Sequence, residues 1–163
     1  MTSIVMTIPH QIAGKFDLRI PGITRTATAM SDLFGSARRS LKILMPYIDP
    51  TLAGLVAAVR APVRIVTTPS PGRAPKSNPV LDRCVAMCGV AVRYFAERGF
   101  QLHARLVIVD RKRAYVGSAN LTDCSFHYNL ETGLLIDDRS LTGRLNDVYD
   151  YVFDHVAVPG DAL

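Results

Sequence analysis

Hydrophobic positions along the chain alternate between helical spacing and short apolar runs, which predicts alternating helices and strands. In residues 26–39, for example, apolar side chains recur at helical spacing. Asp49 followed by Pro50 marks a helix start, and so does Asn78 followed by Pro79. The predicted helices are 26–39, 50–59, 79–89 and 140–156, and the predicted strands are 41–48, 63–67, 90–96, 102–109, 114–118 and 129–136. This succession is typical of right-handed crossovers, so the expected fold class is α/β, a mainly parallel mixed sheet flanked by helices.

The two ends of the chain and one loop complete the predicted organisation. Residues 1–24 are expected to form an N-terminal extension or an edge strand at 3–8, and 68–78 a proline-rich loop. Apolar residues at helical spacing form the predicted stripe of the last helix: Leu141, Leu145, Val148, Val152 and Val156. Acidic residues form its predicted solvated face: Asp147, Asp150 and Asp154. All of 1–163 is expected to be a single domain.

Composition narrows the class of protein. With 163 residues, 48% of them hydrophobic, the chain is too apolar for a disordered tail, and three Cys exclude a small disulfide scaffold. No apolar run approaches the ~18 residues of a membrane span, and no basic segment precedes an apolar one as in a signal peptide. A cytoplasmic protein without a membrane partner is therefore expected. A net charge of +5 suits a polyanion such as nucleic acid, although many basic domains bind none.

The most informative segment is the predicted hairpin between 102 and 118. Strand parity places His103 and Arg105 on one face, with Asp110 at the turn. If Asp110 pairs with Arg113, Arg105 lies opposite Ser118, and His103 lies opposite Asn120. Such a cluster could hold a phosphodiester and leave an imidazole nitrogen free to attack it. The alternative interpretation is an amphipathic hairpin whose polar side faces water.

The spacing of these residues resembles a known catalytic signature. The matching positions are His103-x-Arg105, Asp110, Gly117-Ser118-x-Asn120 and, downstream, Asn129-x-Glu131. This pattern resembles the HKD motif of the phospholipase D superfamily, with every spacing met and the motif lysine replaced by arginine. The resemblance implies a phospholipase D-like single repeat.

The resemblance also implies a two-step displacement without metal or cofactor. His103 would attack phosphorus, while a second motif histidine would protonate the leaving oxygen and then activate water. Glu131 would hold the other ring nitrogen of His103, and Ser118 and Asn120 would contact phosphate oxygens. Asp110 is a structural anchor of the turn in this interpretation; Gly117 and Asn129 complete the motif.

Arginine at position 105 leaves three interpretations open. It keeps the positive charge and binds phosphate in a bidentate manner, but its planar fork demands a different geometry from an ammonium group. The site can then be a working variant, a weakened enzyme or a site kept for binding. Because the other motif positions are intact, retained or reduced activity is favoured.

Further candidates lie outside the motif. The possible zinc ligands are Cys84, Cys88, Cys124 and His127, but their spacing is atypical and helical cysteines are usually buried hydrophobes, so no metal is expected. The candidate nucleic-acid contacts are the basic residues Arg38, Arg39, Arg73 and Lys76.

The sequence therefore predicts a metal-independent phosphodiesterase, an endonuclease acting on DNA or RNA through a phosphohistidine. One alternative is a nucleic-acid-binding or regulatory module with an impaired site. Another is a hydrolase of phospholipid or of a small phosphodiester. Since the mechanism needs two histidines and the chain carries one such motif, a homodimer with the active site at its two-fold interface is expected.

Overall fold

The computed structural model describes residues 2–15, 22–69, 79–86 and 89–163. Its helices are η1 (His10–Lys15), α1 (Thr26–Gly35), α2 (Pro50–Ala57), α3 (Pro79–Ala86), α4 (Asp123–His127), α5 (Arg139–Tyr151), η2 (Val152–Val156) and η3 (Gly160–Ala162). Its strands are β1 (Thr2–Thr7), β2 (Ile23–Arg25), β3 (Leu41–Leu44), β4 (Val63–Thr67), β5 (Val90–Tyr94), β6 (Leu106–Val109), β7 (Arg113–Gly117) and β8 (Glu131–Ile136). The predicted α/β fold, a mixed sheet flanked by helices, is confirmed. The expectation that the sheet is mainly parallel is wrong, because four of the seven pairings between described strands are antiparallel.

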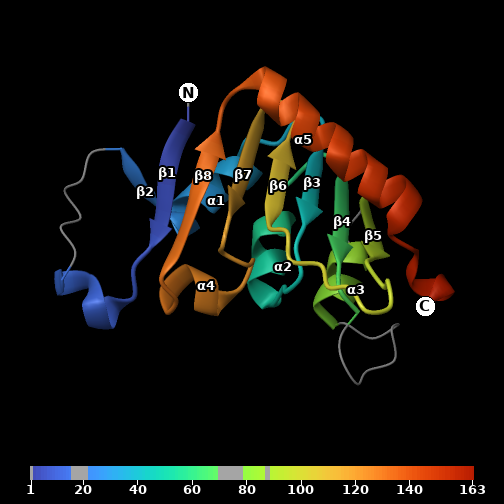
Figure 1. The fold of residues 1–163 in the computed structure, drawn as a ribbon, viewed down its shortest axis with the longest axis horizontal. Coiled ribbons are helices and arrows are strands. Elements are labelled where there is room, and N and C mark those ends of the chain that lie inside the picture. The colour runs from blue at the N-terminus through green and yellow to red at the C-terminus, as the bar shows by residue number, and fades with distance from the viewer. Residues whose placement is uncertain (1, 16–21, 70–78, 87–88) are drawn as a thin grey trace.

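The described strands form one sheet of eight strands in the order β2-β1-β8-β7-β6-β3-β4-β5 (Figure 1). The pairs β3–β4 and β4–β5 are parallel, as the strand–helix–strand succession predicts, and so is β1–β2. The four pairings between β1 and β3 along this order are antiparallel. The prediction of an edge strand at the N-terminus is wrong for β1, because β2 pairs outside it and occupies the edge.

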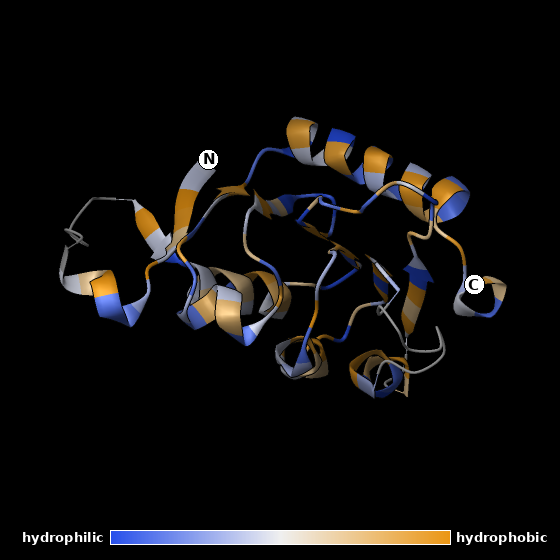
Figure 2. Ribbon diagram, turned by 60° about the horizontal axis from the view of Figure 1, so that its bottom comes forward, coloured by the Kyte–Doolittle hydropathy of each residue, from blue (hydrophilic) through white to orange (hydrophobic). Residues whose placement is uncertain are grey.

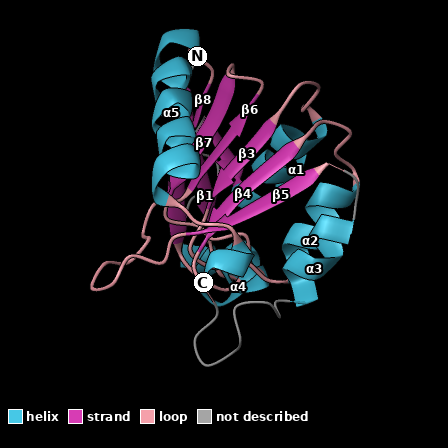
Figure 3. Ribbon diagram, turned by 90° about the vertical axis from the view of Figure 1, so that its right-hand side faces the viewer, coloured by secondary structure: helices cyan, strands magenta, loops and turns pink. Residues whose placement is uncertain are grey.

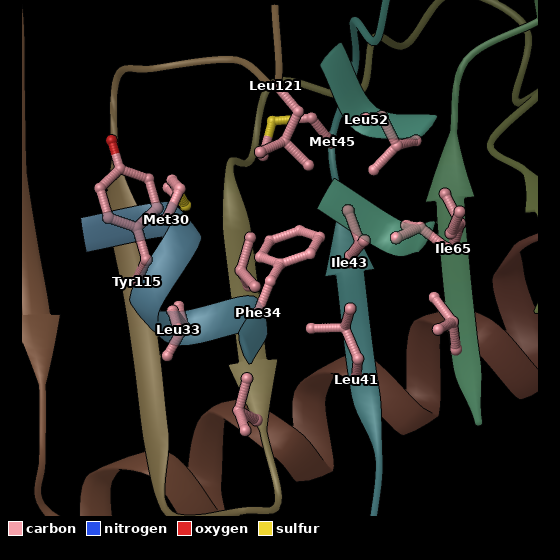
Figure 4. Close-up of a cluster of buried hydrophobic side chains, with 14 of the residues drawn as sticks. Met30, Leu33, Phe34, Leu41, Ile43, Met45, Leu52, Ile65, Tyr115 and Leu121 are labelled. Carbon is pink, nitrogen blue, oxygen red and sulfur yellow. The ribbon is translucent and has the colours of Figure 1, made fainter. Parts of the chain in front are cut away.

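Helices cover the two faces of the sheet unequally. α1, α2 and α3 lie against one face, and α5 runs across the other (Figure 3). Met30 and Phe34 of α1 pack with Ile43 of β3 and Tyr115 of β7 in the core on the first face (Figure 4). Asp49 caps α2 by accepting a hydrogen bond from Thr51 N at 2.7 Å, as its sequence position predicts.

The face that α5 buries differs from the apolar stripe predicted for it. Apolar and polar residues alternate along the helix in Figure 2. Leu141 and Val148 of the predicted stripe are 44% and 58% exposed, whereas Thr142, Asn146 and Tyr149 are fully buried. The buried face is therefore rotated by one residue. Of the helices in the described part of the chain, none combines the length and apolar character that a membrane span requires.

A buried lysine explains this rotation. Lys42 of β3 donates to Asn146 Oδ1 at 2.7 Å and to Asp150 Oδ1 at 2.6 Å, and its Nζ lies 5.7 Å from the centre of the Tyr149 ring. Asn146 in turn donates to Asp150 Oδ2 at 2.8 Å. Since these polar groups satisfy one another, they can be buried at little cost. Asp150 is therefore partly buried and paired with Lys42, and its assignment to a solvated face is wrong.

Candidate active site

The hairpin β6–β7 carries the motif residues, and its turn sets their register. Asp110 and Arg111 have φ angles of 55° and 56°, and Lys112 N donates to Val109 O at 2.9 Å. Val109 then faces Arg113, so three residues rather than two form the loop. The predicted pairing of Asp110 with Arg113 is wrong by one residue because both left-handed residues belong to the turn.

Because of this register, the motif residues lie just beyond the ends of β6 and β7 rather than within these strands. Arg105 precedes β6, and its carbonyl accepts from Gly117 N at 3.4 Å, so Gly117 rather than Ser118 lies opposite it. β7 ends at Gly117, and Ser118 turns toward β8, where its N–H donates to Thr132 O at 2.9 Å. The predicted cross-strand pairs Arg105–Ser118 and His103–Asn120 therefore do not form.

Two glycines make this loop possible. A Cβ at Gly117 would collide with the Tyr115 hydroxyl and lie 2.7 Å from Thr132 O, and a Cβ at its cross-strand partner Gly133 would lie 2.5 Å from the Tyr115 ring. The Tyr115 hydroxyl accepts from Ala119 N at 3.2 Å. Burial raises the pKa of Tyr115, so the phenol stays neutral and fixes the loop.

Glu131 accepts hydrogen bonds from polar side chains in and around the loop that follows β7. Its Oε2 accepts from Ser118 Oγ at 2.5 Å, and its Oε1 accepts from Ser125 Oγ at 2.9 Å and from Asn129 Nδ2 at 3.1 Å. Glu131 is 7% exposed. Three donors around one buried carboxylate fix the positions of three segments of chain: the loop after β7, helix α4 and the loop before β8.

The network continues from Glu131 to the arginine of the motif. Ser125 Oγ accepts from Asn120 N at 3.1 Å, and Asn120 Oδ1 accepts from Arg105 Nε at 3.0 Å. Arg105 Nη1 also donates to His103 O at 3.2 Å. Arg105 and Asn120 thus meet as the motif predicts, through the loop rather than across strands. Asn120 Nδ2 and Arg105 Nη2 donate to no other described group, so both are available to an anion.

His103 is exposed, and its ring makes no hydrogen bond or ion pair with another described residue. The expected bond from Glu131 to this ring is not among the contacts of the described residues, because Glu131 is occupied by Ser118, Ser125 and Asn129. The imidazole is therefore free to contact a substrate.

Asp110 lies at the opposite end of the hairpin and bonds to backbone. Its carboxylate accepts from the N–H groups of Arg38, Arg39 and Ser40, at 2.7 Å from Arg39 and 2.9 Å from Ser40. Burial acts to raise the pKa of Asp110, but these three backbone hydrogen bonds outweigh it and lower the pKa. The carboxylate ties the β6–β7 turn to the segment before β3.

The basic residues proposed to contact nucleic acid are not gathered at His103. Arg38 and Arg39 lie beside Asp110, at the other end of the hairpin, and Arg38 Nη1 donates to Gly35 O at 2.8 Å. Arg73 and Lys76 lie outside the described residues.

The candidate zinc ligands are not brought together either. Cys84 is buried in α3, where burial raises the pKa of its thiol, and Cys124 is exposed on α4. Cys88 lies outside the described residues. His127 lies 3.6 Å from Asp123 on the same helix.

Comparison with known families agrees with this geometry. Residues 30–155 match the family described as "Cardiolipin synthase, PLD-like domain". The chain belongs to the phospholipase D superfamily. Cardiolipin synthase 2 of Bacillus cereus is 31% identical to this phospholipase D-like chain over 136 residues, which are 79% of this chain and 26% of the relative. The chain thus spans about a quarter of the length of the curated relatives that it matches.

Solved structures match the phospholipase D-like fold along its length. NucT from Helicobacter pylori superposes with a TM-score of 0.72 and 17% identity, over 98% of this chain and 99% of that one. Nuc from Salmonella typhimurium, a phospholipase D family member, superposes with a TM-score of 0.69 and 17% identity, over 98% of each chain.

Three residues of this phospholipase D-like site were missed by the sequence reasoning. Ser125 connects Asn120 to Glu131, and Tyr115 and Gly133 shape the loop. The signal for Gly133 was its place two residues after Glu131, where a strand interior disfavours glycine. Ser125 carried no comparable signal, because its role depends on the fold of α4.

Proposed function

We propose that this chain is a metal-independent phosphodiesterase that cleaves nucleic acid endonucleolytically, through a phosphohistidine. The observation that carries the proposal is the exposed ring of His103, which is free of partners among the described residues. It lies two residues before Arg105, whose guanidinium is held by Asn120. Arg105 also donates to the backbone carbonyl of His103, so the unpaired imidazole and the free donors of Arg105 and Asn120 belong to connected segments of chain, which suits attack on a phosphodiester.

The residues divide the chemistry between attack and stabilisation. A ring nitrogen of His103 forms a bond to phosphorus while the bond to the leaving oxygen breaks. Arg105 Nη2 and Asn120 Nδ2 donate to the non-bridging oxygens, on which negative charge accumulates. A second histidine protonates the leaving oxygen; it then takes a proton from water, which attacks phosphorus and releases His103. Glu131 acts as a positioning residue that holds the loop carrying Asn120 through Ser125.

We propose that the second histidine comes from a second copy of the chain. Exposed apolar side chains support such a dimer: Ile4, Leu134 and Val116 are 46%, 45% and 37% exposed and lie directly opposite one another on β1, β8 and β7. An apolar sheet face of this kind favours association with another protein surface.

Two observations bear on the substrate class. The net charge of +5 favours a polyanion, and the fold match to Nuc and NucT extends over nearly the whole of each chain. The second candidate function is hydrolysis or transfer at a phospholipid phosphodiester, which the 31% identity to a cardiolipin synthase favours.

Incubation with labelled single- and double-stranded DNA and RNA in excess EDTA tests the first candidate, and vesicles containing phosphatidylglycerol test the second. We expect EDTA-resistant cleavage within the oligonucleotides, abolished in His103→Ala and retained in His155→Ala, an exposed histidine on η2. Intact-mass measurement during turnover should find a covalent adduct in the wild type, in which the phosphorus on His103 still carries one fragment of the oligonucleotide, and no adduct in His103→Ala. Tight nucleic-acid binding without cleavage overturns the proposal in favour of a binding module, and turnover of vesicles alone overturns it in favour of the lipid reaction.

Light scattering tests the dimer. We expect Leu134→Glu to give a monomer that no longer cleaves, whereas Val85→Glu, at an exposed position of α3 on the other side of the sheet, remains dimeric. A monomeric wild type that still cleaves contradicts the shared site.

A further inference from the structure

Tyr47 is an exposed aromatic residue next to the candidate active site. It follows β3 by three residues and is 57% exposed. The next residue, Ile48, forms a parallel bridge with Leu121, and Asp49 N donates to Leu121 O at 3.3 Å. Because two parallel segments keep the same register, Tyr47 lies beside Asn120, the residue that precedes Leu121.

The side chains of Tyr47 and Asn120 point to the same side of this bridge. Ile48 and Leu121 both pack in the core on the first face of the sheet. Since consecutive side chains of extended chain point in opposite directions, Tyr47 and Asn120 point away from that core. Asn120 Oδ1 accepts from Arg105 Nε at 3.0 Å. The Tyr47 ring therefore lies on the side from which Asn120 and Arg105 would contact a phosphate group.

The backbone is held on both sides of Tyr47. Before it, Pro46 O accepts from Thr68 Oγ1 at 2.6 Å, after the end of β4. After it, the bridge to Leu121 fixes the chain. A tyrosine on a fixed backbone offers a large, rigid contact area at a low cost in conformational entropy. The exposed ring is thus suited to pack against a flat group of a ligand.

The surroundings of the ring favour a nucleobase over a lipid surface. The other apolar side chains of 45–49 and 119–122 are buried or half-buried, so Tyr47 is isolated rather than part of an apolar patch in these two segments. Binding to a lipid surface scales with the apolar area that becomes buried, which one ring provides poorly. One ring is enough to stack one base.

We propose that Tyr47 stacks a base next to the phosphodiester at the candidate active site, and that the chain therefore prefers single-stranded nucleic acid. The inference rests on the proposed function, from which it takes nucleic acid as the ligand. Arg105 Nη2 and Asn120 Nδ2 bind the phosphate oxygens, and the base of the adjoining nucleotide lies on the ring. In a duplex the neighbouring base pairs cover both faces of that base, so it cannot reach Tyr47. Tyr47 determines specificity and takes no part in bond breaking.

Binding measured by fluorescence anisotropy tests the preference, in a His103→Ala background that prevents turnover. We expect Tyr47→Ala to raise the Kd of a labelled single-stranded oligonucleotide about tenfold and to leave that of the matched duplex unchanged. Tyr47→Phe keeps the ring and should keep the wild-type Kd. Tyr151→Ala, which removes a tyrosine of α5 that is 63% exposed, is the matched control and should change neither Kd. An equal loss for both ligands, or no loss for the single strand, overturns the proposal.

Oligonucleotides that lack one base separate stacking from other effects of the substitution. A single abasic site is moved along the strand, and each oligonucleotide is titrated against the protein with Tyr47 and with Tyr47→Ala. At one position we expect the two losses of affinity not to add, because the missing base and the missing ring belong to the same contact. Additive losses at every position contradict stacking. If Tyr47→Ala weakens binding to phosphatidylglycerol vesicles but not to oligonucleotides, the ring contacts lipid and the proposal is wrong.

The two proposals can fail separately. If the chain does not cleave nucleic acid but binds single strands through Tyr47, the proposed phosphodiesterase function fails and the stacking site remains. If the chain cleaves nucleic acid and Tyr47→Ala binds single strands as tightly as before, the stacking site fails and the proposed function remains.

Discussion

The two motif carboxylates lie at opposite ends of the sheet, Asp110 in the β6–β7 turn and Glu131 at the start of β8, and they bond to different kinds of partner. Asp110, at the turn, accepts from three backbone N–H groups of one segment. Glu131, at the other end of the sheet, accepts from three side chains that belong to three segments. Backbone donors are fixed by the fold, whereas hydroxyl and amide donors can rotate. Asp110 therefore stabilises the fold, and Glu131 organises groups that the proposed chemistry uses.

The largest expected effect comes from Glu131→Gln. A glutamine amide presents NH₂ toward one of the hydroxyl donors, so Ser118 or Ser125 must reorient and the position of Asn120 is lost. We expect kcat for phosphodiester cleavage to fall about 10²–10³-fold with a smaller change in KM. Glu97→Gln, at an exposed position, is the matched control and should retain the wild-type rate. An unchanged kcat in Glu131→Gln would show that Glu131 and its hydrogen-bond partners have only a structural role.

Asp110→Asn should lower the stability of the fold and leave catalysis unchanged, the opposite of Glu131→Gln. The asparagine side chain has one accepting oxygen and no negative charge, so it can accept from only some of the three N–H groups. We therefore expect the free energy of unfolding to fall by about 2 kcal/mol. The cleavage rate per folded molecule should be unchanged. Asp147→Asn, which breaks only an exposed pair with Arg111, is the control and should change stability little. A large loss of kcat in Asp110→Asn would contradict the division of roles.

The pH dependence of folding stability tests whether the Asp110 carboxylate stabilises the fold through its negative charge. Because the folded-state pKa of Asp110 is lowered, its contribution is complete above the unfolded carboxyl pKa and is lost as pH falls through the folded value. Urea unfolding of the wild type and Asp110→Asn should therefore differ most near neutral pH, and the difference should shrink in acid. A difference that is constant with pH would assign the effect to packing.

Arg105→Lys tests the arginine of the motif at the Glu131 end. Lysine keeps the charge but cannot hold Asn120 through a planar Nε–H while offering a second N–H to phosphate. We expect kcat to fall about tenfold, equivalent to about 1.4 kcal/mol, with stability unchanged. A faster variant would show that arginine impairs the chemistry.

Much of the fold could be predicted from the sequence because its signals are local. Pro50 after Asp49 and the apolar run of β4 identified α2 and the parallel strands correctly. The buried face of α5 could not be predicted, since it depends on a hydrogen bond from Lys42 to Asn146 across more than a hundred residues. A hydrophobic pattern cannot identify polar groups that satisfy one another in the interior.

The candidate site was predicted in composition but not in geometry. The motif spacing identified Arg105 and Asn120, which do meet. The register was wrong because the φ angles of Asp110 and Arg111 are both positive, and neither residue signals such a turn as glycine would. Ser125 depends on how α4 folds, which residue spacing alone does not reveal.

Asp49 is an intermediate case between the two carboxylates and should give the smallest effect. Its Oδ1 caps α2 through Thr51 N, and its Oδ2 accepts from Asp123 N at 2.7 Å, at the start of the helix that carries Ser125. In Asp49→Asn the cap survives, but an NH₂ group faces the Asp123 N–H, so we expect stability to fall by about 0.5 kcal/mol. Because α4 then shifts against Glu131, kcat should fall about twofold as well. Loss of stability with kcat unchanged would show that Asp49, like Asp110, contributes to the fold and not to the chemistry. Of the three carboxylates, only Glu131 would then affect catalysis.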